Sequence, residues 1–176
     1  MTQKTKSLVL GAATAALYTL LTYLASLLNL AYGPVQFRIS EAMTLLPVLT
    51  PAAVPGLIIG CFLSNLWSPL GVVDLLFGTL ATGLSAIWSR SLRRYRLKGL
   101  PVLSALPPVV CNAVIVGLEI ACLSDAGFSL QSFSWVAFFS SAASVGLGEL
   151  VICLVLGVPL VTVLERSGAV KRIFEG

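Results

Sequence analysis

An all-α, polytopic membrane protein of six helices is the fold class that this sequence predicts, from its composition, its apolar runs and the distribution of its charges. Of the 176 residues, 57% are hydrophobic and only 10% are charged, and the mean hydropathy is +0.99. A soluble domain carries about 25% charged residues, so this chain cannot cover itself with polar surface in water. A lipid bilayer removes that requirement, so the composition predicts an integral membrane protein.

The apolar residues gather in five runs, each long enough to cross about 30 Å of hydrocarbon at about 1.5 Å per helical residue. The runs cover roughly residues 8–31, 41–67, 71–90, 101–123 and 134–164. The second run contains Pro47, Pro51 and Pro55. Proline removes a helical hydrogen bond and disfavours the helical conformation in the residue before it. We therefore expect this run to break near Thr50 and Pro51.

Basic residues decide whether the second run forms one helix or two. They lie in three clusters, which are Lys4 and Lys6, then Arg90, Arg93, Arg94, Arg96 and Lys98, and finally Arg166, Lys171 and Arg172. Basic residues favour the cytoplasmic side of a membrane. After the first helix has crossed outward, the chain must cross an odd number of times before Arg90 for the first two clusters to lie on that same side. A second run split into two helices gives three such crossings, whereas an unbroken run gives two. The sequence therefore predicts six helices with both termini cytoplasmic and a second helix too short to span alone. Their expected bounds are roughly 7–31, 40–50, 52–67, 71–91, 101–123 and 134–165.

The predicted helices use nearly the whole chain, so we expect one transmembrane substrate-binding domain over residues 1–176.

Several function classes find no support in the residues. The chain has no histidine, and its four cysteines lie alone in apolar runs, without zinc or redox spacing. It contains no GxxxxGK[ST] phosphate-binding loop. An enzyme, a resident cofactor or metal and a nucleic-acid partner are therefore not expected.

Polar side chains within the apolar runs are the candidate binding residues, because such groups are costly in a bilayer and mark functional sites. Seven residues are selected by their depth and chemistry: Glu41, Asn65, Trp67, Asp74, Asn112, Glu119 and Glu149. Most of the acids fall in the outer half of the membrane, which predicts an outward-facing pocket for a planar, amine-bearing solute. Carboxylates accept hydrogen bonds from an amine, amides both donate and accept, and tryptophan stacks on flat rings.

For some of these residues a structural role is an equal alternative. Acids near helix ends can face headgroups or stabilise a helix N-terminus, which would account for Glu41 and Asp74. Glu41 can also pair with Arg38, three residues earlier. Tryptophan at a helix end is typical of the interfacial belt, which is the alternative for Trp67. The three candidates on the last two predicted helices lie deeper, where a cavity is favoured.

A face of small residues on the first predicted helix is a candidate contact surface. It consists of Gly11, Ala12, Ala15 and Ala16. Small residues four apart let another helix approach closely. The neighbour is either another helix of this chain or a partner membrane protein.

Two stretches of the sequence resemble the QueT family, whose members are queuosine-precursor substrate-binding (S) components of energy-coupling-factor (ECF) importers. They are QFRISEAMTLLPVLTPAAVPGLIIGCFLSNL at residues 36–66 and GVVDLLFGTLAT at residues 71–82, and the likeness runs over nearly the whole chain. The resemblance implies a six-helix, multi-pass protein of the bacterial plasma membrane without an ATPase of its own. It implies as partners a shared transmembrane coupling subunit and two cytoplasmic ATPases, which hydrolyse the ATP.

The resemblance also implies a solute and a docking motif. The solute would be a deazaguanine with an aminomethyl or nitrile group, captured from outside the cell. S-components carry an alanine-xxx-alanine motif for the coupling subunit on the first helix, and Ala12 and Ala16 match that spacing. No ligand motif carries over, so the seven binding candidates rest on depth and chemistry. The alternatives are an S-component for another cationic heterocycle, such as thiamine, and a stand-alone membrane carrier.

Overall fold

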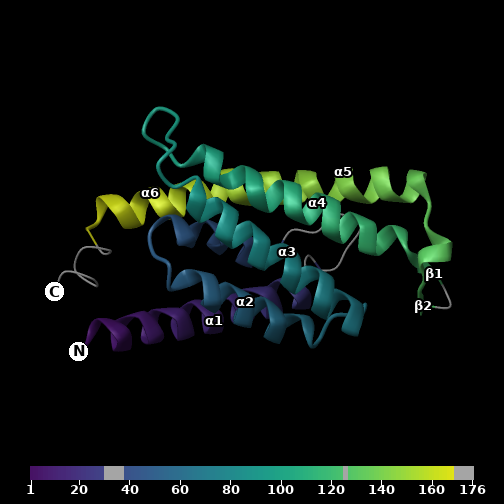
Figure 1. The fold of residues 1–176 in the computed structure, drawn as a ribbon, viewed down its shortest axis with the longest axis horizontal. Coiled ribbons are helices and arrows are strands. Elements are labelled where there is room, and N and C mark those ends of the chain that lie inside the picture. The colour runs from purple at the N-terminus through teal and green to yellow at the C-terminus, as the bar shows by residue number, and fades with distance from the viewer. Residues whose placement is uncertain (30–37, 125–126, 169–176) are drawn as a thin grey trace.

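A computed structural model describes residues 1–29, 38–124 and 127–168, which form a helical bundle with one short β-hairpin (Figure 1). The elements are, in chain order, α1 (Gln3–Leu27), the 3₁₀ helix η1 (Ile39–Val48), α2 (Ala53–Asn65), α3 (Val72–Ser91), the 3₁₀ turn η2 (Val102–Ala105), α4 (Leu106–Ala121), the strands β1 (Leu123–Ser124) and β2 (Gly127–Phe128), the 3₁₀ turn η3 (Leu130–Ser132), α5 (Trp135–Ile152), the π segment η4 (Cys153–Gly157) and α6 (Val158–Arg166).

Within the described residues, four stretches are long and apolar enough to cross a membrane. They are Gln3–Leu27, Val72–Ser91, Val102–Ala121 and Trp135–Arg166. The last stretch joins α5, η4 and α6 into one continuous helix. Two shorter apolar helices, η1 and α2, lie between the first two spans. The predicted all-α membrane protein of six helices with a short second helix is confirmed.

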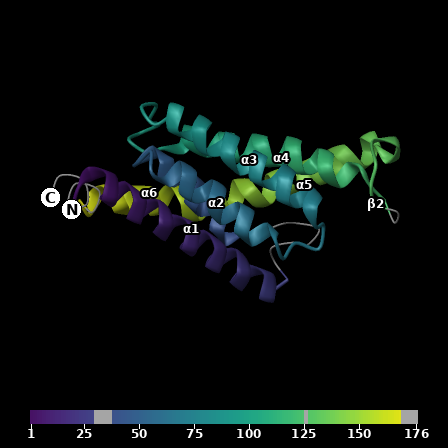
Figure 2. The same cartoon turned by 60° about the horizontal axis from the view of Figure 1, so that its bottom comes forward.

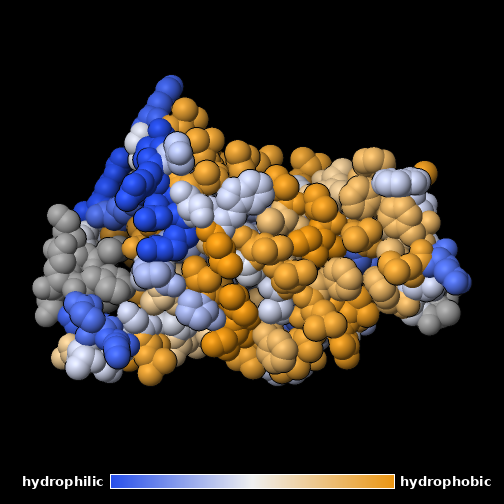
Figure 3. Space-filling model, viewed as in Figure 1, coloured by the Kyte–Doolittle hydropathy of each residue, from blue (hydrophilic) through white to orange (hydrophobic). Residues whose placement is uncertain are grey.

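The outer surface suits a bilayer. On the face shown in Figure 3, hydrophobic residues cover most of the molecule and hydrophilic residues gather mainly at one end. Large apolar side chains such as Leu20, Leu80 and Leu147 are more than half exposed on α1, α3 and α5. So much exposed apolar surface would drive aggregation in water, whereas lipid tails cover it at no cost.

The basic segments share one end of the bundle. The start of α1, the connection between α3 and η2, and the end of α6 lie together, with the β1–β2 hairpin at the opposite end (Figures 1 and 2). Arg96 of this connection forms an ion pair with Glu165 of α6, with Nη2 2.7 Å from Oε1. The three basic clusters are thus brought to one end, except that Lys171 and Arg172 lie outside the described residues.

The first helix begins earlier than predicted. It starts at Gln3 instead of residue 7, because Thr2 caps it: the Thr2 hydroxyl oxygen accepts a hydrogen bond from the Thr5 amide at 3.2 Å. Such a cap satisfies an amide that has no partner within the helix. The helix ends at Leu27 and a turn follows. The last two residues of the predicted helix, 30 and 31, lie outside the described residues.

The short helix η1 runs through the interior. Most of its ten residues are buried, and it contacts α1, α2, α3, η2, α5, η4 and α6. A 3₁₀ helix rises about 2.0 Å per residue, so ten residues reach about 20 Å, compared with about 15 Å for an α-helix. The tighter winding lengthens a segment that is too short to span, while the surrounding helices shield its polar backbone from lipid.

The long last helix widens where it passes η1. At η4, the amide of Val158 bonds to the carbonyl of Cys153, five residues back. Pro159 follows directly, and it has no amide hydrogen to donate to the preceding turn. At Gly157 a Cβ atom would lie 3.1 Å from the carbonyl oxygen of Ala42, so this turn of the helix rests directly on η1.

Helices α1 and α2 cross closely at glycines of α2. A Cβ atom on Gly56 would lie 2.5 Å from the carbonyl oxygen of Gly11 and 2.8 Å from Cβ of Thr14. One turn further, a Cβ atom on Gly60 would lie 2.9 Å from the carbonyl oxygen of Ala15. Small residues four apart permit this backbone approach, which drives helix association in membranes.

We expect Gly56→Ala to lower the melting temperature of the detergent-purified protein, because overpacking a tight contact costs about 1–3 kcal/mol. Gly83→Ala is the matched control, since its Cβ atom would meet Ile58 Cγ1 on α2 at an ordinary distance of 3.4 Å. Alanine is a better helix former than glycine by about 1 kcal/mol, so the control should melt at the same or a higher temperature. Equal melting temperatures for the two variants would contradict the tight crossing.

Candidate binding site

Buried polar side chains gather in the bundle between η1 and the helices around it. Six of the seven predicted site residues belong to this group, each at most 6% exposed: Glu41, Asn65, Asp74, Asn112, Glu119 and Glu149. They come from η1, α2, α3, α4 and α5. The seventh, Trp67, is 63% exposed and packs edge-on against Tyr23, with ring centroids 6.5 Å apart. The structure does not bring Trp67 into the group, and its position fits the interfacial alternative.

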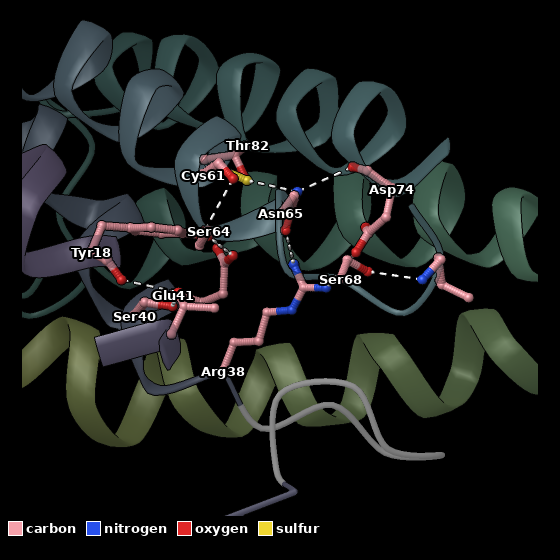
Figure 4. A network of polar contacts seen from close by, with 12 residues as sticks. Tyr18, Arg38, Ser40, Glu41, Cys61, Ser64, Asn65, Ser68, Asp74 and Thr82 are labelled. Atoms are coloured by element: carbon pink, nitrogen blue, oxygen red, sulfur yellow. Dashed lines mark hydrogen bonds and ion pairs between the residues drawn. The ribbon is translucent and has the colours of Figure 1, made fainter. Parts of the chain in front are cut away.

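An ion pair between Arg38 and Asp74 ties three segments together (Figure 4). Nη2 of Arg38 lies 3.3 Å from Oδ2 of Asp74, and both side chains are buried. Nη1 of Arg38 donates to Oδ1 of Asn65 at 3.5 Å, and Nδ2 of Asn65 donates to the backbone oxygen of Asp74 at 3.1 Å. The start of η1, the end of α2 and the start of α3 are therefore joined by one network.

Two glycines make room for Asp74 in this network. Gly71 has φ 64° and ψ −137°, a conformation open essentially to glycine, and α3 begins at the next residue. Asp74 therefore lies in the first turn of α3, where the helix dipole favours a carboxylate. A Cβ atom on Gly78 would lie 2.7 Å from Nδ2 of Asn65 and 2.8 Å from Oδ1 of Asp74. Because glycine has no Cβ atom, the side chains of Asn65 and Asp74 can both lie against the backbone at residue 78.

Helix α1 holds Glu41 in place. The hydroxyl of Tyr18 donates a hydrogen bond to Oε1 of Glu41. The hydroxyl of Thr22 donates to Oγ of Ser40 at 2.6 Å. Tyr18 and Thr22 are four residues apart and share one face of α1. This face fixes the start of η1 and the direction of the Glu41 side chain.

A small cavity lies between η1, α4 and α5. Its lining consists of Arg38, Glu41, Asn112, Val116, Val145 and Glu149. The space open to the centre of a water-sized probe is about 10 Å³, enough for about one water molecule and far below the roughly 300–1,000 Å³ that is usual for small-molecule pockets. Oε1 of Glu149 also accepts from the thiol of Cys153, with Sγ at 3.4 Å. Three predicted site residues on different elements thus border one cavity.

Several buried polar atoms of the site have no hydrogen-bond partner among the described residues. They are Oε2 of Glu41, Oδ1 of Asp74, Nδ2 of Asn112 and both carboxylate oxygens of Glu119. An unsatisfied buried polar group costs about 1–3 kcal/mol, and folded proteins keep few of them. A polar ligand with several donors and an acceptor would satisfy these atoms. In the described ranges, no group of three or more His, Cys, Asp and Glu side chains is suited to a metal ion.

Arg38 and Tyr18 are site residues that sequence reasoning left out. Arg38 is 6% exposed and borders the cavity. Its charge beside an apolar run was a usable signal, but local spacing suggested Glu41 as its partner, whereas its ion pair is with Asp74. Tyr18 carries no charge, and no sequence pattern marks its hydroxyl as the donor to a residue 23 positions away.

The small-residue face of α1 divides into two rows. Gly11 and Ala15 pack against α2 within the chain. Ala12 and Ala16 are exposed, and Ala16 borders an apolar groove between α1 and α2. Packing within the chain therefore accounts for part of this face only. The inner row packs within the chain, and the outer row lies open on the surface.

Comparison with known proteins identifies relatives of the chain. The family model described as "QueT transporter" matches residues 8–166. The curated "Queuosine precursor transporter QueT" of Lactococcus lactis subsp. cremoris (strain MG1363) is 38% identical over 79 residues, which are 45% of this chain and 46% of the relative. The match thus spans about half the length of the curated relative. No solved structure matches the chain.

Proposed function

The chain belongs to the QueT transporter family, and on that premise we propose that it is the substrate-binding subunit of an ECF-type importer that captures a queuosine precursor from outside the cell. The observation that carries this proposal is the set of buried polar atoms without partners inside an apolar bundle. Packing alone gives no reason for such costly groups, whereas a polar solute would use them. The name of the L. lactis relative supports the same solute class.

A deazaguanine offers the groups that these atoms lack. Its amine and amide donors suit the carboxylates, and its ring carbonyl suits the amide nitrogen of Asn112. Either an aminomethyl or a nitrile group extends from the ring. The six buried members of the predicted set are the proposed contacts, together with Arg38 and Tyr18. Trp67 gains no support from its position on the surface.

Binding requires the cavity to widen, because it has room for only about one water molecule, about 10 Å³ for the centre of a water-sized probe. Its walls are η1 on one side and α4 and α5 on the other. Helix η1 packs extensively on α1, α3 and η4 but only lightly on α5, the part of the last helix that borders the cavity. We place the opening at this lightly packed seam, where separation breaks the fewest contacts.

The proposed orientation follows from the charges. The positive-inside rule puts the basic end of the bundle in the cytoplasm. The end of α2 and the start of α3, with Asn65 and Asp74, then lie in the outer half. Ala12 and Ala16 lie near the middle of α1, on a lipid-facing surface where a transmembrane coupling subunit can dock. The chain has no phosphate-binding loop, so two partner ATPases would hydrolyse the ATP, and the chain itself would bind without catalysis.

Saturating aminomethyl-deazaguanine should raise the melting temperature of the purified chain. A ligand at 100 times its Kd stabilises the folded state by about 2.7 kcal/mol, which corresponds to about 5–10 °C for a chain of this length. Thiamine, which represents the alternative class of cationic vitamins, should cause no shift. A shift with thiamine and none with the aminomethyl or cyano deazaguanine would contradict the proposed substrate.

A further inference from the structure

We propose that Glu41 and Glu149 form a subsite for a protonated amine, so that the chain binds the cationic aminomethyl deazaguanine in preference to the neutral cyano form. This inference rests on the proposed function and adds a charge specificity and the residues that carry it. The family match and the name of the relative leave the choice between the two forms open.

The two carboxyl groups border the same cavity from different elements. Glu41 comes from η1 and Glu149 from α5. The thiol of Cys153 contacts the carboxyl group of Glu149 and the backbone oxygen of Glu41. Oε1 of Glu41 accepts from Tyr18, whereas Oε2 has no hydrogen-bond partner among the described residues. Glu149 accepts from a thiol, which is a weak donor. Both carboxyl groups therefore retain the capacity to accept hydrogen bonds from a ligand.

A third side chain, beside Glu149, adds a hydrogen-bond donor to the cavity. Asn112 is 6% exposed and borders the same cavity, and its amide nitrogen has no hydrogen-bond partner among the described residues. A buried amide donor of this kind calls for an acceptor, which a ring carbonyl provides and an ammonium group does not. The cavity thus combines acceptors for an amine with a donor for the ring that carries it.

The charge balance of the cavity favours a cation. Arg38 also borders the cavity, but its guanidinium is engaged with Asp74 and Asn65. Two adjacent buried carboxylates repel each other and lose their hydration, so neither is stable as an anion without a counter-charge. An ammonium group has three donors and a positive charge, and it can bond to both carboxylates at once. A nitrile has neither donor nor charge.

The test measures the Kd of the purified full chain for the aminomethyl and the cyano deazaguanine. The wild type should bind the aminomethyl form at least about tenfold more tightly, because a charge-assisted hydrogen bond contributes about one to two orders of magnitude in affinity. Glu149→Gln should weaken binding of the aminomethyl form by about 10- to 100-fold. Binding of the cyano form should change by less than about threefold, since it makes no charged contact there. Glu41→Gln should show the same pattern.

Glu165→Gln is the matched control, because Glu165 lies on the surface in an ion pair with Arg96; it should leave both affinities unchanged. Equal wild-type affinity for the two forms would overturn the inference and leave the proposed function intact. An equal loss for both forms in Glu149→Gln would also overturn it. If the wild type bound neither form, the proposed function would fail and the subsite with it. The ratio of the two wild-type Kd values tests the amine subsite even where a variant does not fold.

Discussion

Asp74→Ala should destabilise the protein by about 3–5 kcal/mol, because it leaves the guanidinium of Arg38 buried without its counter-ion. Asp74 is 0% exposed and Arg38 is 6% exposed, so water cannot replace the lost carboxylate. The substitution also loosens the network that joins η1, α2 and α3 through Asn65. For a chain of this length, the melting temperature in detergent should fall by about 6–20 °C.

The Arg96–Glu165 pair provides the matched control for burial. Its Nη2–Oε1 distance of 2.7 Å is shorter than the 3.3 Å of the Arg38–Asp74 pair, but its side chains are 27% and 35% exposed. Exposed pairs contribute about 0–1 kcal/mol, so Glu165→Ala should barely change the melting temperature. The double variant Arg38→Gln with Asp74→Asn removes both charges and should recover part of the loss. If Glu165→Ala cost as much as Asp74→Ala, burial would not be the deciding factor.

The positions of the helices could be predicted because the signals for them are local. The break expected near Thr50 and Pro51 lies in the connection between η1, which ends at Val48, and α2, which begins at Ala53. The charge argument that required a third crossing before Arg90 identified η1 as a separate short helix. Burial of the polar candidates also followed from their place in apolar runs, and six of the seven are buried.

The direction of side chains beyond helix ends could not be predicted. Asn65 is the last residue of α2 and points into the interior, whereas Trp67, two residues later, faces outward. Helical periodicity fixes direction only within the helix, so depth alone could not separate the two. The ion pair between Arg38 and Asp74 joins residues 36 positions apart, and no sequence spacing encodes it.

The winding of two segments also escaped prediction, because it depends on tertiary contacts. The residues of η1 are compatible with an α-helix up to Pro47, yet they form a 3₁₀ helix enclosed by seven neighbouring segments. The π segment η4 lies where Gly157 meets Ala42 of η1. Local propensities differ little between these windings, so the packing of η1 against the last helix decides them.

Ala16→Phe and Ala12→Phe should each reduce co-purification of the coupling subunit and the ATPases by about tenfold or more, under the proposed ECF arrangement. Both alanines are exposed on α1, while the neighbouring Gly11 and Ala15 pack against α2. A phenylalanine on the outer row therefore leaves the internal packing unchanged and keeps a partner helix at a distance. Close helix approach in a membrane depends on small residues, so the interface should not tolerate the larger side chain.

Ala143→Phe is the control for this surface, since Ala143 is an exposed alanine on α5 and not on α1. It should leave the complex intact. Ligand binding separates a lost interface from a misfolded subunit: Ala16→Phe should retain the wild-type Kd for the aminomethyl deazaguanine, because the lining of the cavity comes from η1, α4 and α5 and does not include Ala16. A complex that survives both α1 substitutions would favour a different docking face. A wild-type chain that takes up the ligand with no partner present would instead support the stand-alone carrier.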